Sequence, residues 1–131
     1  MIASRTVEYA FLAIGYYAKH KDKKAVKSKD IAKVYGLKTH LYFFKVMQYL
    51  VKADILRSQR GPTGGYTLTK SLDKISMLEV IEAVEGPLEN RLSLTEHAPK
   101  DKFCKKADQV YEKAIGEARK VFKNTKLSDL L

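Results

Sequence analysis

The chain has 131 residues, 45% of them hydrophobic, so it can bury one core and has the size of a single domain. No apolar run approaches membrane-spanning length and no signal-peptide core follows Met1, so we expect a soluble, cytoplasmic protein with no membrane partner. The single cysteine, Cys104, excludes an internal disulfide and cannot by itself hold a zinc ion or an iron-sulfur cluster.

The formal net charge of +10 is confined to the first part of the chain. Residues 1–74 contain 15 Lys and Arg against 5 Asp and Glu, whereas residues 75–131 contain 10 of each kind. This segregation indicates a half that faces a polyanion and a neutral half with another role. Nucleic acid is the leading candidate partner.

The first predicted element is a helix over residues 4–20, where apolar side chains recur at helical spacing and Ser4 or Thr6 is available as the N-cap. Residues 19–27 are mostly charged and predict a loop. Within this loop, residues 25–26 are expected to form a brief strand or a packing contact.

A short helix over residues 29–35 follows, with Ser28 as its cap and Gly36 as a left-handed stop. The next helix covers residues 40–53 and is capped by Thr39. We expect its core-facing stripe to comprise Leu41, Phe44, Val46, Met47, Leu50 and Val51. A short helix, a glycine turn and a longer helix form the helix-turn-helix pattern, although paired helices also occur in other α-rich domains.

A basic hairpin is predicted over residues 56–68, directly after these helices. Two runs with strand-like alternation flank residues 61–65, where one proline and three glycines allow a tight reversal. Arg57 and Arg60 lie on the first arm of the hairpin, and no acidic residue lies between Ile55 and Asp73 to neutralise them. An ordinary surface hairpin would have the same shape, but its position after a helix-turn-helix is typical of a DNA-contacting wing.

These segments resemble the Rrf family of bacterial winged-helix transcription regulators. The resemblance rests on Thr6-Val-Glu-Tyr-Ala10, Ser28-Lys-Asp-Ile-Ala32, Tyr42-Phe-Phe-Lys-Val46, Arg60-Gly-Pro-Thr-Gly-Gly-Tyr66 and the segment from Ile75 to Pro87. It covers residues 3–88 by motif and the remainder by pattern. Asp54 stands where the family usually has a glycine, so we expect a left-handed backbone there.

The resemblance implies a mainly α fold with a small β-hairpin, in which a winged helix-turn-helix precedes a long C-terminal dimerisation helix. Residues 1–88 would form the DNA-binding domain, and residues 89–131 a loop and dimerisation helix packed on the same domain. The implied function is that of a sequence-specific transcriptional regulator, expected to act as a homodimeric repressor on a palindromic operator of double-stranded DNA. Its effector is unknown.

The C-terminal helix is predicted over residues 101–124 and carries two apolar stripes. Tyr111, Ile115 and Phe122 form one stripe. The other, assigned to dimerisation, comprises Phe103, Ala107, Val110, Ala114, Ala118 and Val121. A single broad core-facing surface in a monomer is the alternative. Leu127, Leu130 and Leu131 are expected to tie the chain end back to the domain.

The candidate DNA-binding residues are Ser28, Lys29, Thr39, His40, Tyr42, Lys45, Arg57, Arg60 and Thr63. Lys45 is the best candidate for a phosphate or guanine contact, and His40 for a polar contact in the groove. Thr39 has the alternative role of a cap, and Tyr42 that of a core residue.

Family members that sense redox signals carry three cysteines before the long helix, which with one further ligand hold an iron-sulfur cluster. Residues 88–102 contain no thiol, so we expect a member of the family without a cluster or other metal cofactor. Cys104 is then either a small hydrophobic residue or a thiol sensor whose pKa Lys102, Lys105 and Lys106 would lower.

An enzyme and a protein-interaction adaptor are the two other classes of function to compare with a regulator. An enzyme is not expected, because the sequence contains no supported catalytic triad or phosphate-binding motif and its three histidines lack zinc-ligand spacing. A protein-interaction adaptor that has kept the winged helix but lost DNA binding remains the alternative to a regulator.

Overall fold

The computed structural model of the chain describes residues 3–20, 24–38 and 40–131. Its helices and strands are α1 (Arg5–Lys19), α2 (Ser28–Val34), α3 (His40–Lys52), β1 (Leu56–Gln59), β2 (Gly65–Leu68), α4 (Met77–Glu85) and α5 (Lys102–Asn124). Single 3-10 turns are η1 (Leu72–Lys74), η2 (Leu94–Glu96) and η3 (Leu127–Leu130).

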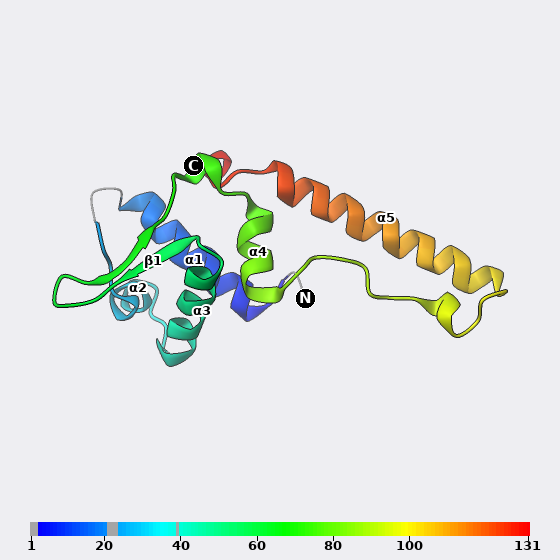
Figure 1. Cartoon of the computed structure of the whole chain (residues 1–131), viewed down its shortest axis with the longest axis horizontal. Helices are drawn as coiled ribbons and strands as arrows, with labels where there is room; N and C mark the ends of the chain where they lie inside the picture. Colours follow the sequence, from blue (N-terminus) through cyan, green and yellow to red (C-terminus); the bar gives the residue numbers. More distant parts are fainter. Residues whose placement is uncertain (1–2, 21–23, 39) are drawn as a thin grey trace.

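The molecule has two regions, a body and an arm (Figure 1). The body comprises α1 to α4, the hairpin and the C-terminal turn η3, and the arm comprises residues 89–125 with α5 as its main element. This arrangement is the predicted mainly helical fold with one small hairpin. Across the described residues, no helix combines the length and the apolar character needed to cross a bilayer.

The core of the body is centred on one face of α3. Phe43, Val46, Met47 and Leu50 are fully buried, at the i, i+3, i+4, i+7 spacing of a helix face. The predicted stripe was wrong at Leu41 and Phe44, which are 75% and 46% exposed. The helix is apolar on nearly every side, so the sequence pattern allowed two rotations, and the packed one places Phe43 inside.

The first two helices begin at different kinds of cap. The Ser4 hydroxyl accepts a hydrogen bond from the Val7 N–H at 3.2 Å, which selects Ser4 from the two predicted caps of α1. The prediction for α2 was wrong by one residue: Lys27 is its N-cap without a side-chain hydrogen bond, and Ser28 is already helical. Val26 makes the expected brief strand contact, a bridge to Tyr66.

Helix α3 ends at a left-handed residue. The Ile55 N–H donates to the Leu50 carbonyl at 3.0 Å, and the Asp54 N–H donates to the Val51 carbonyl at 2.9 Å. This double closure is a Schellman motif, in which the residue after the helix adopts a positive φ. Asp54 has a φ of 61°, which confirms the conformation expected from its place in the sequence.

The hairpin, hereafter the wing, pairs β1 and β2 antiparallel, with Gln59 opposite Gly65 at the tip. A Cβ on Gly64 would lie 2.4 Å from the Gln59 carbonyl oxygen. Gly65 has a φ of 137°, and a Cβ there would lie 2.6 Å from the backbone of Val26. Both positions therefore require glycine for steric reasons, and Gly65 also requires it for its backbone conformation.

The arm leaves the body at the C-terminal end of α4. The chain turns at Gly86, which has a φ of 81°, and the Leu88 N–H then donates to Glu82 Oε2 at 2.7 Å. Arg119 of α5 lies 3.9 Å from the same carboxylate oxygen of Glu82. The start of the arm is thus fixed to α4 by one acidic side chain.

The arm returns to the opposite end of α4. The Met77 N–H donates to the Thr125 carbonyl, and the Leu127 N–H donates to the Ile75 carbonyl, each at 2.9 Å. Leu127 is buried, which confirms that the chain end is tied back to the body. The same expectation was wrong for Leu130 and Leu131, whose side chains are exposed.

Candidate nucleic-acid interface

The outward face of α3 lies opposite its buried face. The exposed side chains recur one turn apart and are Leu41, Phe44, Lys45, Gln48 and Lys52. No Asp or Glu occurs between His40 and Lys52, so this face presents cationic, apolar and neutral polar groups and no anionic one. A protruding helix of this charge has the character of an element that enters the major groove.

The residues predicted at the start of α3 have different surroundings. The hydroxyl of Tyr42 shares a hydrogen bond with that of Thr6, and its ring meets Tyr9 edge-on at a centroid distance of 5.6 Å. Tyr42 therefore packs on α1, although 39% of it remains exposed. Thr39 lies outside the described residues, as does the side chain of His40.

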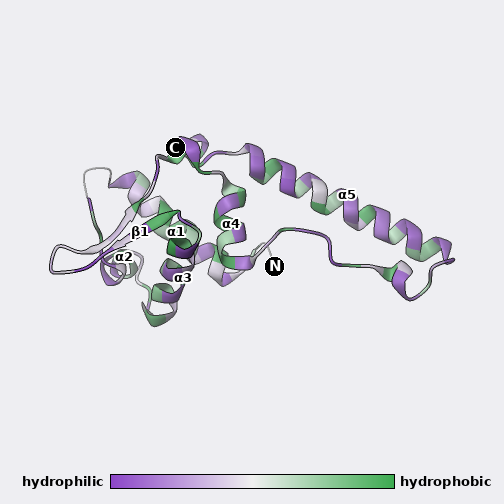
Figure 2. Ribbon diagram, in the orientation of Figure 1, coloured by the Kyte–Doolittle hydropathy of each residue, from purple (hydrophilic) through white to green (hydrophobic). Residues whose placement is uncertain are grey.

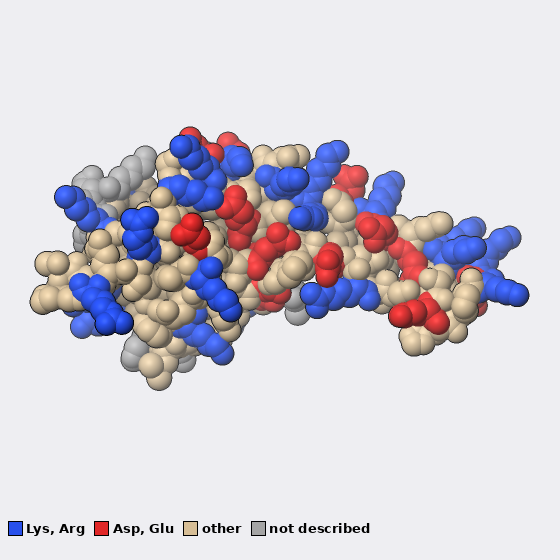
Figure 3. Space-filling model, viewed as in Figure 1, with Lys and Arg blue, Asp and Glu red and all other residues tan. Residues whose placement is uncertain are grey.

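The predicted wing residues are all accessible. Arg57, Arg60 and Thr63 are exposed, and Arg57 stands opposite Thr67 in the strand register. Figure 3 shows scattered Lys and Arg over the wing end of the molecule, acidic side chains over its middle, and a second group of Lys and Arg at the far end of the arm. The wing end thus carries positive charge with few acidic neighbours on this face.

The start of α2 lies beside the tip of the wing. Lys29 and Thr63 line one open hollow of about 410 Å³ between these segments. Lys29 is exposed and Ser28 is half-buried. The fold thus brings two predicted contact residues together from positions 34 apart in the sequence, with the carboxylate of Asp30 on the wall of the same hollow.

Tyr66 joins the wing to the rest of the body, a role that sequence reasoning missed. Its hydroxyl accepts a hydrogen bond from Gln48 Nε2 on α3 at 2.6 Å, and its carbonyl accepts one from the Tyr17 hydroxyl at 2.6 Å. Its N–H donates to the Val26 carbonyl at 2.8 Å. Burial raises the pKa of Tyr17 well above its usual range, which keeps this phenol protonated as a donor. The wing and α3 therefore hold a fixed relative position.

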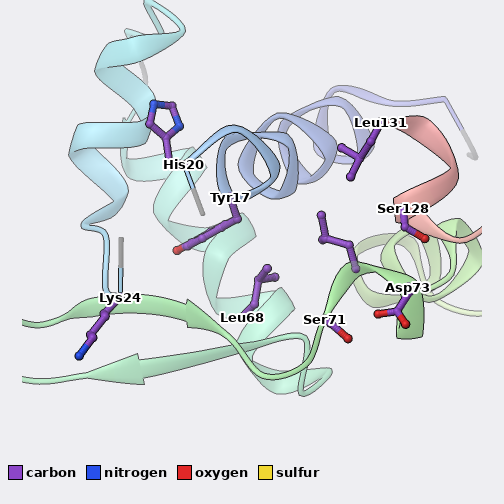
Figure 4. A pocket seen from close by; sticks show the side chains of 9 residues that line it. Tyr17, His20, Lys24, Leu68, Ser71, Asp73, Ser128 and Leu131 are labelled. Atoms are coloured by element: carbon purple, nitrogen blue, oxygen red, sulfur yellow. The ribbon is translucent and has the colours of Figure 1, made fainter. Parts of the chain in front are cut away.

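A cavity of about 510 Å³ lies at the base of the wing, between the end of α1 and the C-terminal turn (Figure 4). Tyr17 and Leu68 form part of its wall, with Lys24 at one side and Asp73 at another. The Ser71 hydroxyl lowers the pKa of Asp73, so its carboxylate stays charged near neutral pH. The volume is in the range of small-molecule sites, and its wall carries both signs of charge.

Cys104 lies in the first turn of α5. The Asp101 carboxylate caps this turn by accepting hydrogen bonds from the N–H groups of Phe103 at 2.8 Å and Cys104 at 3.2 Å. Desolvation and the carboxylates of Asp101 and Asp108 raise the pKa of the thiol. The alternative in which lysines lower this pKa was wrong, because desolvation and the two carboxylates raise it. A sensor role for Cys104 stays a prediction.

The donor groups of one chain do not fit the iron-sulfur cluster that the resemblance suggests. Such a cluster needs about four ligands, mostly thiolates, and the chain has one cysteine. Within residues 3–20, 24–38 and 40–131, no three His, Cys, Asp or Glu side chains are grouped so that they could hold a metal ion.

The arm exposes part of its predicted dimerisation stripe. Phe103, Val110 and Val121 are 78%, 67% and 61% exposed, and Ala114 is exposed on the same line of the helix. The two remaining members, Ala107 and Ala118, are half-buried and lie at the edge of this line. Figure 2 shows hydrophobic and hydrophilic patches alternating along α5.

Comparisons with known proteins agree with this architecture. The sequence profile of the Rrf2 family, described as an iron-dependent transcriptional regulator, matches residues 3–131. A protein of Aquifex aeolicus (strain VF5), named among the HTH-type transcriptional regulators, is 32% identical over 134 residues, covering 100% of this chain and 92% of its own.

Solved structures show the same fold. CymR, described as the global cysteine regulator of B. subtilis, has a TM-score of 0.81 and 24% identity, covering 98% of this chain and 94% of its own. IscR of T. potens has a TM-score of 0.73 and 27% identity, with coverages of 98% and 84%. The relatives are transcriptional regulators rather than enzymes, which confirms the predicted winged helix and the class of function. With its helix-turn-helix, wing and arm matched along nearly the whole chain, the protein belongs to the Rrf2 family of transcriptional regulators.

Proposed function

We propose that the protein is a transcriptional repressor that binds double-stranded DNA in the cytoplasm as a homodimer, on an imperfect palindrome. The outward face of α3 and the wing carry this proposal, because the Gln48–Tyr66 hydrogen bond holds them together on a cationic end of the molecule. The helix would lie in the major groove, while Arg57 and Arg60 contact phosphates or the adjacent minor groove.

The test is a salt titration of binding to a duplex selected from random DNA. Each phosphate neutralised releases counterions, so the logarithm of the binding constant should fall linearly with the logarithm of salt, by roughly 0.9 per contact. Lys120→Ala, which removes a lysine of the arm, is the matched control and should leave the slope unchanged. Absence of binding at low salt would contradict the proposal.

Two variants distinguish a residue that recognises the base sequence from a residue that positions the protein on the DNA backbone. Lys45→Ala should weaken binding and relax the preferred sequence, with a loss on the order of 1–3 kcal/mol if Lys45 contacts a base. Arg60→Ala should weaken binding to all sequences similarly, since a wing contacts mainly the backbone. If both folded variants bind like the parent, the proposed orientation on DNA is wrong.

The homodimer is proposed to form through the arm. The support is the exposed line of Phe103, Val110, Ala114 and Val121, which a twin helix would cover in a two-fold arrangement. Sedimentation equilibrium at micromolar concentration measures the association. A monomer under these conditions would contradict the dimer and, with it, the palindromic operator.

We also propose that the regulator acts without an iron-sulfur cluster. One thiol per chain would supply a dimer with two of the roughly four ligands that a cluster needs. Anaerobic purification followed by iron and sulfide analysis is the test. Near-stoichiometric iron with a visible absorption band that Cys104→Ser removes would overturn this part of the proposal.

The second candidate is a protein-interaction adaptor. One observation favours it: Leu41 and Phe44 expose apolar surface on the helix that would read DNA. An adaptor would form the dimer but show no salt-dependent affinity for duplex DNA, so the salt titration separates the two functions.

A further inference from the structure

An apolar pair interrupts the cationic outward face of the recognition helix. Leu41 is 75% exposed and Phe44 is 46% exposed, and both lie in the first two turns of α3. Neither contributes to the core, which Phe43 and Met47 fill from the opposite side of the helix. The pair is therefore available to a partner at the position where recognition helices approach base edges.

The charges around the pair restrict the chemistry of that partner. Lys45 adjoins Phe44, Lys52 lies further along the same face, and Arg57 follows on the wing, all of them exposed. A partner that covers Leu41 and Phe44 must also neutralise these cations. The major groove of duplex DNA meets both needs, since phosphates border the groove and thymine places a C5-methyl group inside it.

We propose that Phe44 and Leu41 read thymines by contacting their C5-methyl groups in the major groove. The proposal rests on the proposed function as a DNA-binding regulator and deepens it by naming the base read. Residues three apart rise by about 4.5 Å along a helix, which is close to the 3.4 Å spacing of base pairs. The two side chains therefore reach neighbouring base pairs, and each half-site contains thymine at one or both of them.

The experiment replaces single thymines of a selected site by deoxyuridine, which removes only the C5-methyl group. Binding of the full chain is measured at one fixed salt concentration. Loss of one buried methyl corresponds to about a fourfold weakening. We expect this loss at one or two positions in each half-site and no change at the other thymines.

Variants of the protein assign each methyl group to a side chain. Phe44→Ala should bind the thymine site more weakly than the parent and should no longer distinguish thymine from deoxyuridine at its own position, and Leu41→Ala should do the same at the neighbouring position. Lys45→Ala should bind more weakly but keep the full discrimination. Leu92→Ala, which truncates an exposed apolar residue of the arm, should bind like the parent. Circular dichroism checks that each variant is folded.

The possible results distinguish a failure of thymine recognition from a failure of the proposed DNA-binding function. If the parent binds a selected duplex with the expected salt dependence but tolerates deoxyuridine at every position, thymine reading is wrong while DNA binding stands. Discrimination that survives in both Phe44→Ala and Leu41→Ala also overturns it. If the protein binds no duplex at low salt, the proposed function fails together with this inference.

Discussion

The body and the arm differ in where their apolar side chains lie. In the body, the single helix α3 contributes four completely buried side chains, which are Phe43, Val46, Met47 and Leu50. In the arm, the 23 residues of α5 include no buried one, and several of its large apolar side chains are more than half exposed. The comparison indicates that the body is stabilised by its own core, whereas the arm leaves apolar surface exposed, which the proposed dimer would cover.

The largest expected difference between the regions concerns core truncation. Phe43→Ala should lower the free energy of unfolding by about 3–5 kcal/mol, because it leaves a cavity in a fully packed site. Val110→Ala should leave the unfolding of the monomer within about 0.5 kcal/mol of the parent, since its side chain is exposed. Thermal denaturation at a concentration below dimer formation measures both. Equal destabilisation by the two variants would contradict the comparison.

Two glycine variants, one in the wing and one in α5, test the comparison of body and arm further. Gly65→Ala should destabilise the protein by roughly 1–3 kcal/mol, because it combines a positive φ with a backbone clash at Val26. Gly116→Ala in α5 should stabilise it by roughly 0.5–1 kcal/mol, since a new Cβ there meets open space and alanine favours a helix. Chemical denaturation checks both signs, and a stabilising Gly65→Ala would refute the steric account.

A smaller effect is expected at the contact between the wing and α3. Gln48→Ala removes the donor to the Tyr66 hydroxyl and should cost about 1 kcal/mol. Hydrogen exchange should increase in β2 more than in the arm. Gln109→Ala, an exposed glutamine of α5, is the matched control and should be neutral. Unchanged exchange in β2 would show that the wing keeps its position without this hydrogen bond.

The smallest effect concerns the loop around η2, which packs on the first turns of α5. Asp108 accepts hydrogen bonds from the N–H groups of Leu94 and Thr95, at 2.8 and 3.0 Å. These hydrogen bonds lower its pKa below the ordinary value of 3.8. The carboxylate therefore stabilises the loop fully above pH 3.8, and this stabilisation is lost as the pH falls through the lowered pKa.

Hydrogen exchange of residues 94–98 as a function of pH measures this loss. Exchange, corrected for its intrinsic pH dependence, should rise only on strong acidification in the parent. Asp108→Asn should show the higher exchange already at neutral pH, while Glu117→Gln, on the exposed side of the same helix, should behave like the parent. A parent loop that opens near neutral pH would contradict the assignment to Asp108.

The elements of the fold were predictable because their signals are local. The stop of α2 at Gly36, the left-handed Asp54 and the glycine-rich reversal of the wing each depend on a few neighbouring residues. The rotation of α3 was not predictable in the same way. Either Phe43 or Phe44 satisfies a helical stripe, and only packing against the other helices decides between them.

The exposed basic residues of the candidate site were predictable, but the contacts that hold its segments together were not. Charge segregation and motif order placed Lys45, Arg57 and Arg60 on exposed elements, as the structure has them. The junction at Tyr66 and the steric need for Gly64 depend on segments distant in sequence or on the exact path of a turn. No local pattern carries that information.

Both ends of the arm are attached to α4, a helix of nine residues. Helix α4 packs against both α1 and α3, so a rotation of α5 would act on the body through this short helix. In the proposed dimer, a change in the angle between two arms would be transmitted to the distance between the two recognition helices. Successive turns of the major groove are spaced by about 34 Å, so the affinity for an operator would depend on the stiffness of this linkage as well as on the contacts made to DNA.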